Sequence, residues 1–254
     1  DREREERLVA RLLLNTVAEA CGLERRIEVD LVEGERLDES TVIAPEPWQR
    51  LLLGKVETVL HGGPPDRAEG PPKAILSGAF NPIHFGHRRM AEIAREILRM
   101  PVDLEIPIIN ADKPPVDYCD LERRLEQIGP GQPVWLTRAA KFVDKSRLFP
   151  GVTFVVGADT LRRLVAPRFY DDDPAACQVA LEQITTRGCR FLVFGRDVGD
   201  GFVALGDLDL PDPLPSICQE VPAAEFREDV SSTEIRKRGS PDGPNSTQGA
   251  APRE

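Results

Sequence analysis

The stretch at residues 74–90 reads AILSGAFNPIHFGHRRM and is the clearest structural signal in the chain. It opens with a short apolar run at residues 74–76, which is typical of a buried strand. Small residues and an Asn-Pro pair follow, and they indicate a tight turn. From residue 88 the apolar side chains recur at helical spacing. The stretch therefore predicts a strand, a turn and a helix in succession.

The start of this predicted helix is a candidate anion-binding point. The first backbone N–H groups of a helix lack partners within the helix, and the helix dipole favours negative charge there. His84 and His87 fall at and just inside this terminus, where their rings add side-chain donors. The chain has only three histidines, so two in one turn indicate a binding site rather than an ordinary surface turn.

The composition is that of an ordinary globular protein, and it limits the partners. Hydrophobic residues make up 41% of the 254 positions and charged residues 30%. The net charge of −10 argues against non-specific binding to nucleic acid or to an anionic membrane, because both need a basic surface. We therefore expect no nucleic-acid and no membrane partner. A nucleotide stays open, since a local cationic pocket suffices to bind one.

The sequence also predicts a compartment and the state of its thiols. It has neither an apolar run of about 18 residues nor a signal-peptide pattern, which predicts a cytoplasmic protein. The five cysteines are scattered, and none forms a C-x-x-C pair. This spacing predicts reduced thiols and no zinc site, and no residue is assigned as a metal ligand.

Patterning and Pro/Gly content predict four parts of the chain. A helix over residues 1–20, a strand over 27–32, a helix over 45–53 and a strand over 55–61 indicate an N-terminal α+β appendage. The Pro/Gly-rich stretch that follows indicates a linker, in which His61 is expected to face solvent. The last residues are of low complexity and are expected to be disordered. The predicted parts are the appendage at 1–60, the linker at 61–72, the main domain at 73–238 and the tail at 239–254.

The main domain is predicted to be an α/β domain. Further apolar runs indicate buried strands at residues 102–109, 134–138, 152–156 and 190–196, with helical patterns between them. Strands that alternate with helices imply a parallel sheet with right-handed crossovers.

Two of these strands end in residues that suit ligand binding. Ligands of open α/β sheets lie beyond the carboxyl ends of the strands. Gly157 and Asp159 follow one strand, and Arg196 ends another. The Asp159 carboxylate suits a ribose or nucleobase contact, and a helix N-cap is its other interpretation. Near the C-terminus, Ser231 and Glu234 fit a capping box, a pattern that alone implies no function.

Together these patterns resemble a known family. HFGH at residues 84–87 is similar to the H/T-x-G-H signature of the nucleotidyltransferase superfamily. The wider string SGAFNPIHFGH at 77–87 most resembles nicotinamide or nicotinate mononucleotide adenylyltransferases, and FVVGADTL at 154–161 resembles their second motif. VSSTEIR at 230–236 resembles the I-S-S-T-x-I-R motif of the superfamily. The resemblance covers about residues 73–238.

The resemblance implies a Rossmann-like nucleotidyltransferase fold and an adenylyl transfer. ATP would donate its adenylyl group to a pyridine mononucleotide, giving the dinucleotide and pyrophosphate in NAD biosynthesis. Mg²⁺ would accompany ATP and keep most of its waters, which agrees with the lack of an obvious carboxylate cluster in the sequence. A homo-oligomer is left open.

The resemblance also implies roles for individual residues. His84, His87 and Arg236 are expected to be catalytic through contacts to the phosphates of ATP. Lys113 is either a contact to the acceptor phosphate or a solvent-exposed charge, and Trp135 is either a contact to the acceptor ring or a core residue. The residues expected to bind ATP or its phosphates are Ser77, Gly78, Ala79, Phe80, Gly86, Ser231, Ser232 and Thr233. Those expected to bind the nucleotide or substrate are Gly157, Asp159, Lys113, Trp135 and Arg196.

Other functions stay open at this point. The chain could be a pantetheine-phosphate adenylyltransferase, a cytidylyltransferase, or a nucleotide-binding sensor without turnover. His84 favours the mononucleotide group, because the pantetheine-phosphate enzymes usually carry Thr at this position. The intact histidines and the intact Ser-Ser-Thr string argue against a sensor. No residue distinguishes the amide from the acid form of the acceptor.

Overall fold

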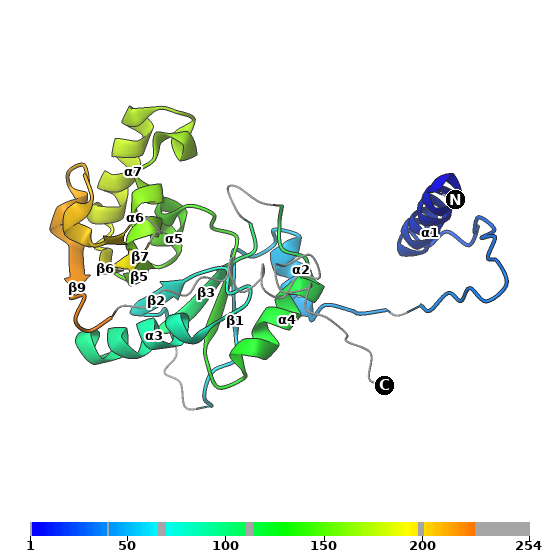
Figure 1. Cartoon of the computed structure of the whole chain (residues 1–254), viewed down its shortest axis with the longest axis horizontal. Helices are drawn as coiled ribbons and strands as arrows, with labels where there is room; N and C mark the ends of the chain where they lie inside the picture. The colour runs from blue at the N-terminus through cyan, green and yellow to red at the C-terminus, as the bar shows by residue number, and fades with distance from the viewer. Residues whose placement is uncertain (1, 40, 66–69, 110–113, 198–200, 227–254) are drawn as a thin grey trace, which may run out of the picture. The chain divides into compact units, whose positions relative to one another are not determined.

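The computed structural model describes residues 2–39, 41–65, 70–109, 114–197 and 201–226, and its helices and strands are labelled in Figure 1. The chain divides into two compact units, with the boundary between Ile43 and Ala44. The predicted tail at 239–254 lies outside the described residues. Among the described residues, no helix combines the length and the apolarity that crossing a membrane requires.

The first unit contains a long helix and an extended segment. Helix α1 (Arg2–Ala20) forms where the sequence predicts it, but none of its residues is buried. The strand predicted at residues 27–32 is absent. Instead, the backbone of Ile27 exchanges two hydrogen bonds with the amide of Asn15, at 2.7 and 2.8 Å, and Arg11 pairs with Asp30 at 2.7 Å. The described part of this unit holds no strand, so the segment at residues 27–32 finds no strand there with which to form the backbone hydrogen bonds of a sheet.

The appendage boundary predicted at residue 60 is wrong. Helix α2 (Glu46–Leu52) buries Trp48 and Leu51 in the core of the second unit. Strand β1 (Thr58–His61) pairs antiparallel with a strand of the main sheet, Thr58 opposite Thr137. His61 lies in this strand, half-buried, with its ring 5.5 Å from that of Trp48, rather than in an exposed linker. Residues 44–61 therefore belong to the α/β unit.

The second unit is built on a mostly parallel sheet, as the sequence predicts. The strand order among the described residues is β1-β4-β3-β2-β5-β6-β9, and only β1 is antiparallel to its neighbour. Strand β2 is central: Leu76 lies opposite Leu104 on one side and opposite Val155 on the other. The parallel strands are β2 (Ala74–Ser77), β3 (Asp103–Pro107), β4 (Val134–Thr137), β5 (Thr153–Gly157), β6 (Arg190–Phe194) and β9 (Cys218–Val221).

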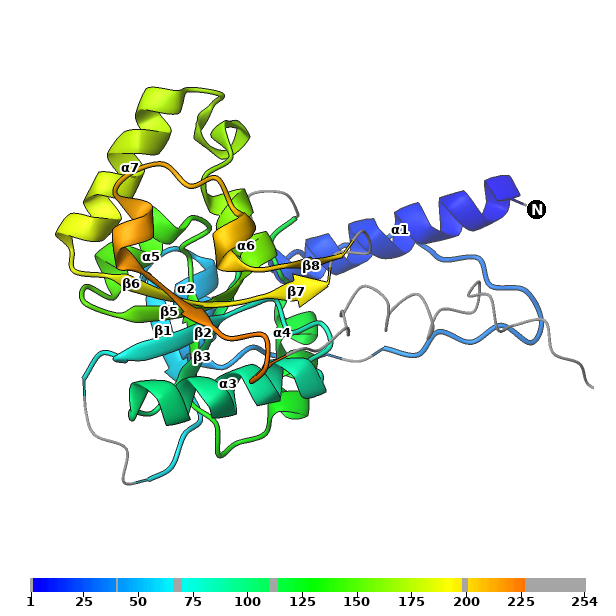
Figure 2. The ribbon, with the colours of Figure 1, turned by 60° about the vertical axis from the view of Figure 1, so that its left-hand side comes forward.

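Helices cover both faces of this sheet. Figure 2 shows α3 (Phe85–Leu98) and α4 (Tyr118–Ile128) on one face, and α5 (Phe142–Leu148), α6 (Ala158–Leu164) and α7 (Pro174–Thr186) on the other. Capping aspartates start two of them: Asp117 accepts from the backbone of Asp120, and Asp173 from that of Ala175, both at 2.8 Å. Smaller elements are η1 (Pro167–Tyr170), β7 (Arg196–Asp197), β8 (Phe202–Val203), η2 (Leu205–Asp207) and η3 (Leu214–Ile217).

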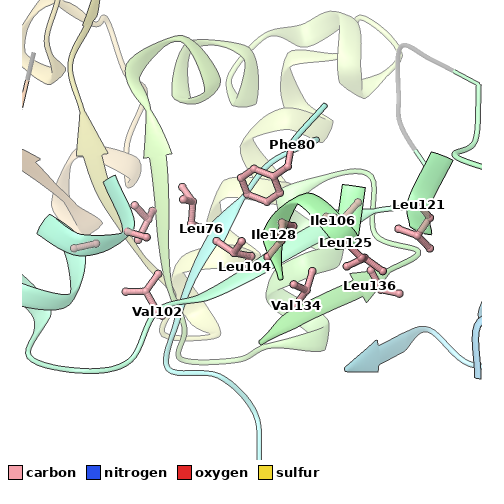
Figure 3. Packing of buried hydrophobic residues seen from close by; sticks show 14 of the residues in the cluster. Leu76, Phe80, Val102, Leu104, Ile106, Leu121, Leu125, Ile128, Val134 and Leu136 are labelled. Atoms are coloured by element: carbon pink, nitrogen blue, oxygen red, sulfur yellow. The ribbon is translucent and has the colours of Figure 1, made fainter. Parts of the chain in front are cut away.

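Each face of the sheet has its own apolar core, because successive strand residues point to opposite faces. In β2, Leu76 packs with the α3 and α4 side, whereas Ile75 packs with the α6 and α7 side. Figure 3 shows the first of these cores, in which Leu121 and Leu125 of α4 pack near Leu136 of β4. The continuous burial of short strands such as β2 and β6 is what a parallel sheet covered on both sides requires.

The strand order creates a switch point beside β2. From β2 the chain builds β3 and β4 in one direction, and then returns to place β5 and β6 on the opposite side. In open α/β sheets a crevice forms at the carboxyl ends of the strands at such a reversal. The fold therefore places a binding crevice at the ends of β2 and β5.

Candidate active site

The carboxyl ends of β2, β5 and β6 surround a cavity of about 140 Å³, here called the histidine pocket. Ser77 and Gly78 line it from the end of β2, and Gly157 lines it from the end of β5. His84 and His87 line it from the start of α3. The pocket thus lies at the switch point of the sheet, where the strand order reverses.

The two histidines are held by the first turn of α3. His84 is the N-cap residue, in an extended conformation, and its backbone N–H donates to His87 Nδ1 at 3.3 Å. The two rings stack with their centroids 3.7 Å apart, and the ring of Phe80 meets His87 edge-on at 5.0 Å. Both imidazoles are therefore aligned at the positive end of a helix of 14 residues.

Both histidines are neutral at pH 7 in this arrangement. Burial, and after it the neighbouring His84 and Arg196, lower the pKa of His87 to about 3. Burial and then Arg196 lower the pKa of His84. Because Nδ1 of His87 accepts a hydrogen bond, the proton of the neutral ring resides on Nε2. His87 can therefore donate a hydrogen bond from Nε2.

Two polar atoms of the pocket residues are buried without a hydrogen-bond partner among the described residues. They are Nδ1 of His84 and Oδ1 of Asp159. An unpaired buried polar atom costs free energy, roughly 1–3 kcal/mol, unless a ligand or water completes its hydrogen bonding. Both side chains line the histidine pocket, so a ligand in the pocket would supply the hydrogen bonds that these two atoms lack.

Asp159 and Arg196 supply the charges of the pocket. Arg196 Nη1 lies 3.5 Å from Asp159 Oδ2, and both side chains are about one-third exposed. The N-cap of α6 is Gly157 and not Asp159, so the capping interpretation of Asp159 is wrong. A Cβ at Gly157 would come within 2.5 Å of Asp159 Oδ1, so glycine there leaves room for the carboxylate.

The turn between β2 and α3 is locked from both sides. A Cβ at Gly78 would lie 2.8 Å from the Phe80 ring, so only glycine fits beneath it. Phe80 itself has φ +44° and is 1% exposed, so its burial offsets the strain of a left-handed backbone. From α4, Arg124 Nη1 donates to the carbonyl oxygen of Ala79 at 2.9 Å.

A second cavity of about 240 Å³ adjoins the histidine pocket, and we call it the basic pocket. The two share Ser77, Gly78 and Thr160 as a common wall. No carboxylate of the described residues lines the basic pocket. Its cations are Lys141, Lys145 and Arg163, and its aromatic rings are Phe142, Phe169 and Tyr170. This lining suits a flat anionic ligand.

The structure brings together most of the predicted site residues that it describes. Those that line the histidine pocket are Ser77, Gly78, His84, Gly86, His87, Gly157, Asp159 and Arg196. Ala79 lines the basic pocket instead, and Phe80 is a buried support beneath Gly78. Lys113, Ser231, Ser232, Thr233 and Arg236 lie outside the described residues.

Trp135 is not brought to either pocket. It lies within β4, where its Nε1 donates to Asp103 at 2.9 Å and its ring meets Phe149 edge-on at 5.2 Å. Side chains alternate along a strand, and at this register position the ring packs against the core on the α6 and α7 side. The core interpretation of Trp135 is therefore the one that the structure supports.

Sequence reasoning missed the cations and aromatic rings of the basic pocket and the buried charge behind them. Glu105 is wholly buried in β3, between Leu104 and Ile106. A carboxylate inside a predicted apolar strand signals a paired charge, because an unpaired one costs too much to bury. Its partner Lys145 lies 40 positions further along, and no local pattern links the two.

Comparison with known families assigns the chain. The family described as cytidylyltransferase-like matches residues 75–238, a span that starts in β2 and holds both histidines and the three strand ends of the pocket. The chain belongs to the cytidylyltransferase-like family. Among curated proteins, none matches the chain. Membership supports nucleotidyl transfer as the general activity, and the Rossmann-like sheet agrees with it.

Proposed function

We propose that the chain transfers the adenylyl group of ATP to a pyridine mononucleotide, giving the dinucleotide of NAD biosynthesis and pyrophosphate. The observation that carries this proposal is the pair of adjoining pockets with Ser77, Gly78 and Thr160 as their common wall. Two substrates held in adjoining pockets meet at that wall. Direct transfer between them then becomes a matter of positioning.

ATP is assigned to the histidine pocket. The start of α3, Arg196 and the donor at His87 Nε2 provide positive potential for phosphates. The unpaired Oδ1 of Asp159 provides an acceptor for a ribose hydroxyl or a base amino group. The Ser-Ser-Thr string and Arg236 are proposed to hold the leaving pyrophosphate.

The acceptor is assigned to the basic pocket. A pyridine mononucleotide carries a flat ring and a phosphate on one ribose. The pocket offers aromatic rings such as Phe142 and Tyr170, and the cations Lys141 and Lys145 lie beside them. The rings take the place of Trp135, which packs in the core, and the expected contact of Lys113 to the acceptor phosphate stays a prediction. A pantetheine arm would need a long apolar groove, whereas three cations interrupt the apolar part of this lining.

The reaction needs neither a covalent intermediate nor a general base. A phosphate oxygen of the acceptor is already ionised and attacks the α-phosphorus of ATP in line. The new P–O bond forms as the bond from the α-phosphorus to the bridging oxygen breaks, and pyrophosphate leaves with that electron pair. His87 Nε2 donates to the charge on the transferred group, and such a preorganised donor is worth roughly 10²–10³ in kcat.

ATP is proposed to enter as its Mg²⁺ complex. Across the described residues, no group of three or more His, Cys, Asp or Glu side chains is placed to hold a metal ion. Asp159, paired with Arg196, is the carboxylate in the histidine pocket. This donor set fits an ion held mainly by phosphate oxygens and water, which neutralises part of the phosphate charge.

Product analysis tests the proposal. The protein is incubated with ATP or CTP and with nicotinamide mononucleotide, nicotinate mononucleotide or phosphopantetheine, and the products are weighed by mass spectrometry. We expect a dinucleotide from ATP and at least one pyridine mononucleotide, and roughly 10²–10³ times less of it from the matched His87→Ala protein at the same enzyme concentration and time.

Two results would contradict the proposal in different ways. Adenylylation of phosphopantetheine, or a preference for CTP, with both mononucleotides untouched would leave nucleotidyl transfer intact and change the substrates. No product from any pair would instead point to a binding protein without turnover.

A further inference from the structure

A buried carboxylate organises the floor beneath the two pockets. Glu105 is 0% exposed and accepts three hydrogen bonds. The donors are Ser77 Oγ at 2.5 Å, Thr137 Oγ1 at 2.5 Å and Lys145 Nζ at 2.6 Å. They come from β2 and β4, the two strands on either side of β3, and from helix α5. We call these four residues the Glu105 cluster.

Lys145 has an unfilled bonding capacity within this cluster. Its Nζ donates to Glu105 Oε2 and to Ser77 Oγ, both at 2.6 Å. An ammonium group has three hydrogens, and the described residues provide these two acceptors. Lys145 also lines the basic pocket although it is only 3% exposed. A ligand oxygen in that pocket would complete its bonding.

The Lys145 ammonium group lies next to the wall between the two pockets. Ser77, 2.6 Å from Nζ, belongs to the wall shared by both pockets. The attacking phosphate of the acceptor has to lie at that wall to reach the α-phosphorus of ATP in the histidine pocket. The other two cations of the basic pocket differ, because Arg163 is exposed and Lys141 is half-buried.

We propose that Lys145 binds the phosphate of the acceptor and that Glu105 is a positioning residue, which holds the ammonium group at the wall between the pockets. This inference rests on the proposed function and extends it to a residue on α5. A lysine fixed by Glu105 and Ser77 loses its rotamer freedom on folding and not on substrate binding. Its contact to the attacking phosphate is thereby preorganised.

The competing explanation is that Lys145 serves only as the counter-ion of Glu105. Single substitutions do not separate the two, because removing one partner leaves the other charge buried and unpaired. The double variant Lys145→Met/Glu105→Gln removes both charges with side chains of similar volume. A purely structural pair would then be dispensable for substrate binding.

Steady-state kinetics and calorimetry on the full chain distinguish the explanations. For the double variant we expect KM and Kd for the mononucleotide to rise about 10- to 100-fold, as for loss of a charge-assisted hydrogen bond, while KM for ATP changes less than about threefold. Arg147→Met is the matched control: Arg147 lies on the same helix, is exposed and pairs with Glu57 outside both pockets. It should leave both KM values unchanged. Unchanged mononucleotide KM and Kd in the double variant would overturn the inference.

Failure of the proposed function gives a different result. If the unaltered protein turns over no mononucleotide, calorimetry with inorganic phosphate as the probe still decides: weaker binding to the double variant supports the inference, and equal or no binding to both proteins overturns it. If the double variant does not fold, a crystal structure of the unaltered protein with nicotinamide mononucleotide decides. A phosphate oxygen within hydrogen-bond distance of Lys145 Nζ supports the inference, and a phosphate held elsewhere overturns it.

Discussion

The Glu105 cluster and the histidine pocket lie at the same edge of the sheet, but the buried carboxylate of the first is fully hydrogen-bonded, whereas two polar atoms of the second are unpaired. Glu105 has three donors within 2.6 Å, supplied by the chain itself. In the pocket, His84 Nδ1 and Asp159 Oδ1 have no partner among the described residues. A buried group whose hydrogen bonds are all made within the chain stabilises and specifies the fold, whereas a group with a bond left over is free to bind a ligand. Glu105 is therefore scaffold, whereas the unpaired atoms of the histidine pocket and the remaining hydrogen of Lys145 Nζ are left for a ligand.

The largest expected effect comes from breaking the ion pair of the Glu105 cluster. Lys145→Met leaves the buried Glu105 charge without its cation, and we expect the free energy of unfolding to fall by about 3–5 kcal/mol. Urea denaturation measures it. The Lys145→Met/Glu105→Gln double variant should recover most of the loss. A single variant as stable as the unaltered protein would show that the cluster is not a structural unit.

Removing a hydrogen-bond donor from the histidine pocket should act on catalysis instead. His87→Ala is expected to lower kcat by roughly 10²–10³, which corresponds to about 2.7–4 kcal/mol of transition-state stabilisation. Rates are measured at a temperature where circular dichroism shows the variant to be folded. Near-normal kcat would remove His87 from the transfer step.

The neutral state of His87 gives a pH-dependent contrast. Burial first, then His84 and Arg196, lower its pKa to about 3, below the ordinary value of 6.5. Between these values the unfolded chain binds a proton that the folded chain does not, so stability is full above pH 6.5 and falls as the pH drops towards 3. The single-group slope is at most about 1.4 kcal/mol per pH unit.

Thermal or urea denaturation at several pH values measures this slope. His87→Gln, which does not titrate, should lose less stability than the unaltered protein between pH 6.5 and 4, because the shared acidic groups contribute equally to both. Parallel pH curves for the two proteins would contradict the buried neutral histidine.

The smallest expected effect is at Asp159. Asp159→Asn keeps the shape and one acceptor oxygen but removes the charge beside Arg196. We expect KM for ATP to rise about two- to tenfold, the value of one ordinary hydrogen bond, with little change in kcat. An unchanged KM for ATP would place the base and ribose elsewhere, and a change in the mononucleotide KM alone would reverse the assignment of the two pockets.

Much of this arrangement is predictable from the sequence, because its signals are local. The run at residues 74–76 and the turn that carries both histidines form as predicted, since strand periodicity and helix starts depend on neighbours in sequence. The positions of Gly157 and Asp159 at a strand end follow from the same logic. Such signals also place the histidine turn and the Gly157–Asp159 turn at the same edge of a parallel sheet.

The missed features depend on contacts between distant parts of the chain. The ion pair of Lys145 with Glu105 spans 40 positions, and the pairing of β1 with β4 joins Thr58 to Thr137. Trp135 shows the same limit, because the strand register decides which face its ring occupies. Strand β9 was not predicted, since Gln219 and Glu220 interrupt its apolar pattern on an exposed edge.

The turn after β2 has a consequence for enzyme engineering. At Gly78 the Phe80 ring leaves no space for a side chain, whereas the next residue, Ala79, is exposed and lines only the basic pocket. Two adjacent positions thus differ completely in what they tolerate. A library restricted to position 79 would resize the basic pocket one methylene at a time, while the histidine pocket and the folded scaffold stay as they are.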